Sequence, residues 1–124
     1  MQKLNLENME SSKEKKDKIV LLPIKTYHQI RTPLVSLLGK NFKIEVIIDK
    51  DVIDFRNSDW QEQIHNFVSS KFKELKTSDI YLCPVGPPPL SLYLFYVLIK
   101  NGINVKILAW DPSRKKYEVI ECLS

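Results

Sequence analysis

The stretch Asp79–Asn101 reads D-I-Y-L-C-P-V-G-P-P-P-L-S-L-Y-L-F-Y-V-L-I-K-N and decides the fold of this chain. It has no charged residue between Ile80 and Ile99, although 27% of the chain is charged. A membrane span needs about 20 apolar residues in one helix. The prolines and the glycine in the first half leave a helix of about half that length, so we expect no membrane partner.

The stretch divides into three predicted elements. Ile80–Cys83 is an apolar run that predicts a strand buried on both faces. Pro84–Pro89 predicts a stiff turn around Gly86, and Leu90–Lys100 predicts a helix that begins after proline and ends at an Asn-Gly pair. A strand, a tight loop and a buried helix make half of a βαβ unit, whose loop is where open α/β sheets bind ligands.

Size and composition limit the functions that the chain can have. With 124 residues, 44% of them hydrophobic, and a net charge of +4, it is one globular domain that favours anionic partners mildly. It has no basic tract, so we expect no duplex nucleic acid as partner. Cys83 and Cys122 lie in strand-like sequence without a signal peptide, which predicts buried free thiols and a cytoplasmic location. No Cys/His set has metal-ligand spacing, and we expect no cofactor.

The amino-terminal segment differs from the rest of the chain. Residues 1–17 contain equal numbers of lysines and acids and little apolar content, which predicts a disordered tail. Residues 18–124 are then a single α/β domain that carries the whole positive excess.

The remaining elements follow from local patterns. Apolar or alternating runs predict four further strands, at Lys18–Ile24, Phe42–Ile48, Asn104–Trp110 and Lys116–Cys122. Thr32 and Pro33 predict the N-cap and first position of a helix that ends at Gly39. Ser58–Gln61 predicts a capping box for one long helix that continues to Leu75.

Alternation of strands and helices predicts the architecture. The order β-α-β-α-β-α-β-β requires a mostly parallel sheet with helices on both faces, a Rossmann-like three-layer fold. The linker between the last two strands is too short for a parallel crossover, so they form an antiparallel hairpin at the edge. In a 2-1-3-4 strand order the winding reverses between the first and third strands, and the loops after Ile24 and Cys83 flank one crevice.

The loop after the first strand supplies candidate ligand-binding residues. Lys25 can pair with a phosphate, Thr26 is a neighbouring polar group, Tyr27 can stack on a base, and His28 can transfer a proton. An exposed histidine without a function is the alternative for His28. Arg56, in the loop after the second strand, is a further cationic candidate.

The loop at Pro84 supplies the other side of the crevice. It lacks the glycine pattern of dinucleotide-binding loops and the lysine of phosphate-binding loops. Three prolines remove N–H donors, which leaves the backbone of Val85, Gly86, Leu90 and Ser91 and the Ser91 hydroxyl. Such a loop suits a flat ligand with dispersed charge, with a purely structural helix start as the alternative.

The helix Leu90–Lys100 is apolar nearly all round. One sheet covers only one face of a helix, so a second surface must cover the rest. We expect a homodimer or a higher homo-oligomer.

The carboxyl-terminal half resembles a family of signalling sensors. The strand and proline loop D-I-Y-L-C-P-V-G-P-P-P-L, the apolar helix and the closing K-I-L-A-W-D-P-S-R-K-K-Y-E-V-I strands are similar to CARF and SAVED domains. With the opening I-V-L-L-P-I and the strand I-E-V-I-I-D, residues 18–124 look most like the small stand-alone Csx-type proteins encoded beside type III CRISPR systems.

The resemblance implies a CARF-like fold that binds a cyclic oligoadenylate, with the four-membered ring expected, across a homo-oligomer interface. The matching ligand loops are Lys25–Tyr27 and Pro84–Ser91, although prolines replace the family's polar helix start. Two alternatives remain open. One is a metal-independent ring nuclease, for which the only catalytic candidates are His28, Lys25 and Ser91. The other is a non-catalytic subunit of a larger antiviral complex. The residues favour binding over catalysis.

Overall fold

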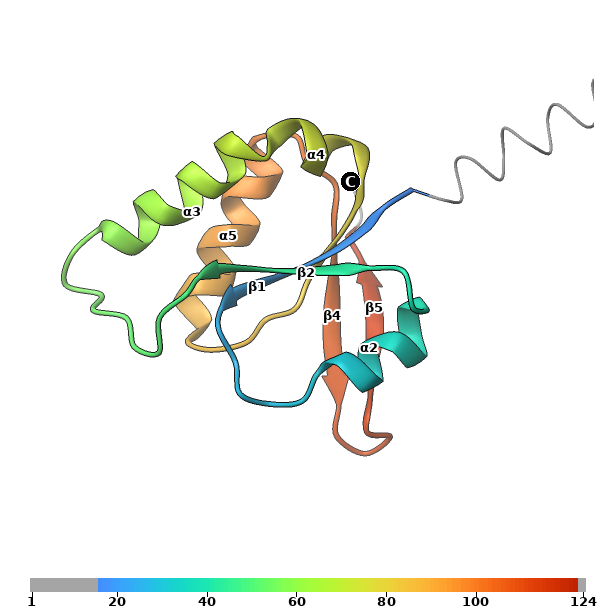
Figure 1. The fold of residues 1–124 in the computed structure, drawn as a ribbon. Helices are drawn as coiled ribbons and strands as arrows, with labels where there is room; N and C mark the ends of the chain where they lie inside the picture. The colour runs from blue at the N-terminus through green and yellow to red at the C-terminus, as the bar shows by residue number, and fades with distance from the viewer. Residues whose placement is uncertain (1–15, 123–124) are drawn as a thin grey trace, which may run out of the picture.

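The computed structural model describes residues 16–122, so most of the predicted tail lies outside the described residues. The elements in chain order (Figure 1) are β1 (Lys18–Ile24), α2 (Arg31–Leu38), β2 (Lys43–Ile48), α3 (Asp59–Ser70), α4 (Phe72–Thr77), β3 (Asp79–Leu82), α5 (Pro88–Lys100), β4 (Val105–Asp111) and β5 (Lys116–Glu121). The backbone carbonyl of Asp17 already accepts a hydrogen bond from the N–H of Asp79, at 2.7 Å. The hydrogen bonding of the sheet therefore extends to the residue before the first strand.

The five strands form one sheet in the order β2-β1-β3-β4-β5. The first four are parallel, and β4 pairs with β5 antiparallel through a short turn. Val20, in the middle of β1, has Ile44 of β2 on one side and Tyr81 of β3 on the other. The predicted strand order, parallel sheet and edge hairpin are confirmed.

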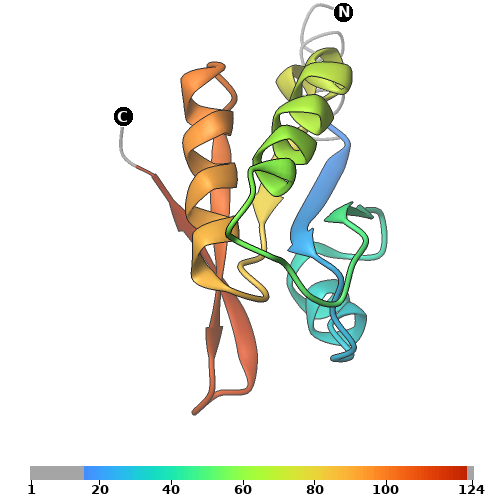
Figure 2. The same cartoon turned by 90° about the vertical axis from the view of Figure 1, so that its left-hand side faces the viewer.

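Helices cover both faces of the sheet and create two cores. Ile19 and Leu21 of β1 belong to the core under α3, α4 and α5, whereas Val20 and Leu22 belong to the core under α2. All four side chains are at most 3% exposed, which explains why β1 has an uninterrupted apolar run. Figures 1 and 2 show α3 and α5 side by side on one face, with α2 on the other.

The start of α2 differs from the prediction. The helix begins at Arg31 with Ile30 at the N-cap position, so Thr32 is not the cap and Pro33 is the third helical residue. Proline fits there because the N–H groups of the first turn have no acceptor inside the helix. The predicted end at Gly39 is confirmed by its φ of +85°.

The predicted long second helix is two helices. Lys71, with φ −107°, separates α3 from α4, although residues 69–71 contain neither glycine nor proline. The capping box is also absent, because the Ser58 side chain makes no cap hydrogen bond and Asn57 Oδ1 instead accepts from the N–H of Asp59, at 3.1 Å. The break leaves Phe72 38% exposed and buries Leu75.

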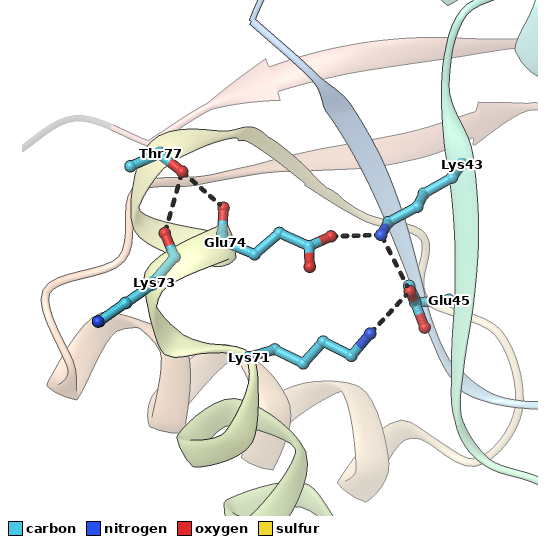
Figure 3. A network of polar contacts seen from close by, with 6 residues as sticks. All are labelled: Lys43, Glu45, Lys71, Lys73, Glu74 and Thr77. Atoms are coloured by element: carbon cyan, nitrogen blue, oxygen red, sulfur yellow. Dashed lines mark hydrogen bonds and ion pairs between the residues drawn. The ribbon is translucent and has the colours of Figure 1, made fainter.

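A chain of alternating charges holds the α3–α4 junction against the sheet edge (Figure 3). Lys71 pairs with Glu45 of β2 at 3.2 Å, Glu45 with Lys43 at 3.4 Å, and Lys43 with Glu74 of α4. The Glu74 side chain is 38% exposed. Its pKa is lowered because Lys43 donates a hydrogen bond to its carboxylate.

The longest helix in the described part of the chain is α5, with 13 residues. Across residues 16–122 no helix has the length and apolarity that a membrane crossing requires.

Candidate ligand-binding site

The winding of the sheet reverses at the carboxyl ends of β1 and β3. The chain leaves β1 at Lys25, whose N–H donates to the Ile48 carbonyl at 3.3 Å, and continues toward α2. It leaves β3 at Cys83, whose N–H donates to the Leu21 carbonyl at 3.0 Å, and continues toward α5 on the opposite face. The two predicted loops therefore diverge from adjacent strands, as ligand-binding crevices require.

Gly86 lets the loop after β3 lie close against the end of β1. Its φ is +81°, and a Cβ atom at this position would overlap Cγ2 of Ile24. Only glycine combines this backbone conformation with so close an approach. The neighbouring Val85 packs against the cores on both faces of the sheet, so this turn lies between the two cores.

A cavity of about 410 Å³ lies beside the turn at Val85 and Gly86, on the α2 side of the sheet. It is lined by residues from three segments, namely Thr26, His28, Gln29, Ile30, Pro33, Val85, Trp110 and Tyr117. Thr26, His28 and Val85 come from the two predicted loops. The loop residues were expected in the crevice, but the contribution of the β4–β5 hairpin was not.

Trp110 and Tyr117 form the wall that sequence reasoning missed. They lie opposite each other in the β4–β5 ladder, with ring centroids 5.0 Å apart and an interplanar angle of 66°. Tyr117 is nearly buried at 9% exposure, whereas Trp110 is 47% exposed. The hairpin prediction contained the necessary signal, because the short turn at residues 112–115 sets this register.

Tyr117 also contacts the buried thiol of Cys83. The Cys83 Sγ to Tyr117 Oη distance is 3.7 Å. Burial raises the pKa of both groups above their ordinary values, so both stay protonated at neutral pH. Both cysteines are free, as predicted, but Cys122 is exposed rather than buried because it follows the end of the edge strand β5.

The polar side chains of the cavity are arranged by short-range hydrogen bonds. The Thr26 hydroxyl oxygen accepts from the N–H of His28 at 3.2 Å, and the Gln29 side-chain oxygen accepts from the N–H of Arg31 at 3.0 Å. The Thr26 hydroxyl proton and the Gln29 NH₂ group remain as donors. The described lining residues include no Asp, Glu, Lys or Arg.

Lys25 and Tyr27 contact the loop that follows β2. Lys25 Nζ lies 3.4 Å from Asp49 Oδ1 and 3.6 Å from Asp51 Oδ1, and the Tyr27 hydroxyl donates to Asp51. The Tyr27 hydrogen bond, and then the positive charge of Lys25, lowers the pKa of the Asp51 carboxyl. Asp51 raises the pKa of both Lys25 and Tyr27. Lys25 therefore belongs to an exposed ion-pair cluster with Asp49 and Asp51 of the loop after β2.

The other cationic candidate is also paired. Arg56 Nε lies 2.9 Å from Asp54 Oδ1, and the arginine side chain is 91% exposed. The pairing lowers the pKa of Asp54 and raises the pKa of Arg56.

The α5 end of the Pro84 loop offers fewer donors than predicted. The N–H of Leu90 donates to the Pro87 carbonyl at 3.1 Å and is therefore not free for a ligand. The Leu90 side chain is fully buried, Pro84 is exposed, and Ser91 is half-buried on α5. Of the three catalytic candidates, His28 lines the cavity, whereas Lys25 and Ser91 are not among its described lining residues.

Comparison of the chain with protein-family models, curated proteins and solved structures finds no significant match. The functional argument therefore depends on the geometry of the crevice.

Proposed function

We propose that this chain binds a cyclic oligoadenylate second messenger, with cyclic tetra-adenylate as the expected ring, in the crevice between β1 and β3. The observation that carries the proposal is the cavity at the winding reversal, which joins an exposed tryptophan to hydrogen-bond donors. Cavities of this kind bind flat, partly apolar ligands. The resemblance of residues 18–124 to CARF-like proteins supports a role in type III CRISPR antiviral signalling in the cytoplasm.

The two sides of the crevice suit different parts of such a ligand. The cavity side offers aromatic surface and uncharged donors, which suit a base. The β2 side offers Lys25 and, in the loop after β2, Arg56. Both suit phosphates once the ligand displaces their carboxylate partners. A cyclic oligoadenylate alternates bases and phosphates along one ring and can contact both sides.

A homo-oligomer is part of this proposal. Leu92, Tyr96 and Ile99 form an apolar stripe on α5 and are 70%, 51% and 46% exposed. Their spacing places them on one side of the helix. A second copy on this stripe would give the assembly two equivalent crevices, each on the α2 side of its own sheet.

The exposed stripe also favours a second candidate function. A larger protein could cover Leu92, Tyr96 and Ile99 instead of a second copy, and the chain would then be a non-catalytic subunit of an antiviral complex. In that case the purified chain stays monomeric and does not retain the ring.

Calorimetric titration with cyclic tetra-adenylate tests the proposal. We expect binding, with Lys25→Ala weakening it by about tenfold or more because a phosphate contact is lost in each subunit. The matched control is Lys73→Ala, whose side chain points away from the ion-pair network (Figure 3) and which should bind like the wild type. Absence of binding to the wild-type chain, or equal binding by both variants, contradicts the assignment. Chromatography of the recovered ligand then shows whether the ring is cleaved.

A further inference from the structure

Trp110, which lines the cavity and is 47% exposed, indicates which part of a ligand enters it. Resting on the proposed function, we infer that the cavity formed by Thr26, His28, Gln29, Trp110 and Tyr117 is a purine-base subsite, with the base stacked on Trp110. The subsite would hold one base per protomer.

The aromatic wall has the geometry that stacking requires. Tyr117 contacts the indole of Trp110 at an interplanar angle of 66°, which is an edge contact, and the Trp110 residue remains 47% exposed. Tyr117 is itself held by the ladder pairing and by its contact with Cys83. A half-exposed tryptophan supported by a buried neighbour is a pre-organised platform for a flat ring.

The remaining walls complement the edge of a purine. The free donors are the Gln29 NH₂ group and the Thr26 hydroxyl, because the oxygen of each side chain already accepts a backbone N–H. Purine ring nitrogens are acceptors. Ile30, Pro33 and Val85 supply apolar contacts around the rest of the ring.

The described lining residues do not favour a phosphate in the same cavity. The described residues that line the cavity contain no lysine or arginine, so a phosphate there would lose hydration without gaining a lysine or arginine partner. The neighbouring cations, Lys25 and Arg56, contact acids of the loop after β2 instead.

The two tryptophans of the chain allow a direct test. Trp60 is a residue of α3 that is 9% exposed and contacts Tyr93 of α5, whereas Trp110 lines the cavity. In a Trp60→Phe variant the emission reports on Trp110 alone. We expect adenosine monophosphate to quench it, ribose 5-phosphate to leave it unchanged, and cyclic tetra-adenylate to quench it at lower concentration.

A second pair of variants keeps the test decisive if Trp60→Phe does not fold. In the wild-type background, Trp110→Ala should weaken ring binding in calorimetry by about tenfold or more, and Trp110→Phe should retain most of it. The Trp110→Phe variant, whose emission comes from Trp60, should not respond to adenosine monophosphate.

The outcomes separate this inference from the proposed function. Ring binding in calorimetry without a Trp110 response, and with unchanged affinity in Trp110→Ala, overturns the base subsite and leaves the proposed function standing. Quenching by adenosine monophosphate without any ring binding supports the subsite and overturns the proposed function. Quenching by ribose 5-phosphate overturns the subsite, because that molecule has no base. Failure of every ligand overturns both.

Discussion

Gly86 is the residue at which a single added carbon should change the molecule most. Substitution by alanine forces an L-residue into a φ of +81° and places Cβ against Ile24 at the end of β1. We expect Gly86→Ala to lower the free energy of unfolding by more than the backbone term of about 1–2 kcal/mol. Chemical denaturation measures this loss.

Gly102 provides the matched control for Gly86. Its φ is +73°, but a Cβ atom there would meet only the flexible end of the Lys76 side chain, at 3.4 Å. Gly102→Ala should therefore show the backbone cost alone. Equal losses in the two variants would mean that the contact with Ile24 has no energetic weight.

Cys83 and Tyr117 make the stability of the fold sensitive to alkaline pH. Burial raises the pKa of both groups, so the unfolded chain releases their protons at a lower pH than the folded chain does. The resulting stability is complete below the unfolded thiol pKa, about 8.5, and is lost as the pH rises above it. We expect Tm to fall by several degrees between about pH 8 and pH 10 in calorimetry.

The variants Cys83→Ala and Tyr117→Phe test the assignment of this pH dependence. Each removes one of the two ionisable groups, so Tm should fall less steeply with pH than it does in the wild type. An unchanged slope in both variants would assign the alkaline loss to other groups.

At the scale of elements, the loop after β2 competes with an anionic ligand for Lys25. Asp49 and Asp51 occupy the cation that a phosphate would need. If the proposed function holds, Asp51→Asn should tighten ring binding by up to about fivefold, because an exposed ion pair is a weak competitor. Calorimetry at low ionic strength measures the change, and Asp59→Asn, which removes the same charge at the start of α3, is the control. Weaker binding in Asp51→Asn would make Asp51 a ligand contact rather than a competitor.

The sequence predicted the strands and the sheet order better than the helix ends. Strands such as β1 are encoded by runs that must be apolar on both faces, and the strand order follows from chain connectivity. The break at Lys71 coincides instead with a contact to another element, the pairing of Lys71 with Glu45. No local pattern specifies such contacts.

The site was predictable only in part, for a related reason. The positive φ of Gly86 and the crevice between two loops follow from local sequence and topology. The cavity wall of Trp110 and Tyr117 depends on hairpin register, and the pairing of Lys25 with Asp49 and Asp51 depends on how two loops meet. Trp110 and Tyr117 are distant in sequence from the loops predicted to flank the crevice, and no local pattern specifies how two loops meet.

At the scale of the whole molecule, the exposed stripe on α5 predicts self-association. We expect light scattering at micromolar concentration to give a multiple of 14.5 kDa, and Leu92→Glu to reduce it to the monomer mass. Val52→Glu is the control, because Val52 is 80% exposed but lies in the loop after β2. A wild-type mass of one chain would contradict the homo-oligomer.

The central position of β1 has a consequence for synthesis on the ribosome. β1 precedes the other four strands, and it can pair with β2 once residue 48 has emerged, but its second neighbour, β3, begins only at residue 79. At about 5–20 residues per second, one edge of this apolar strand waits roughly 2–6 s for its partner. An open apolar edge is a template for other nascent chains. A fragment that ends at residue 78 should therefore sediment as aggregate at concentrations at which the full chain stays in solution.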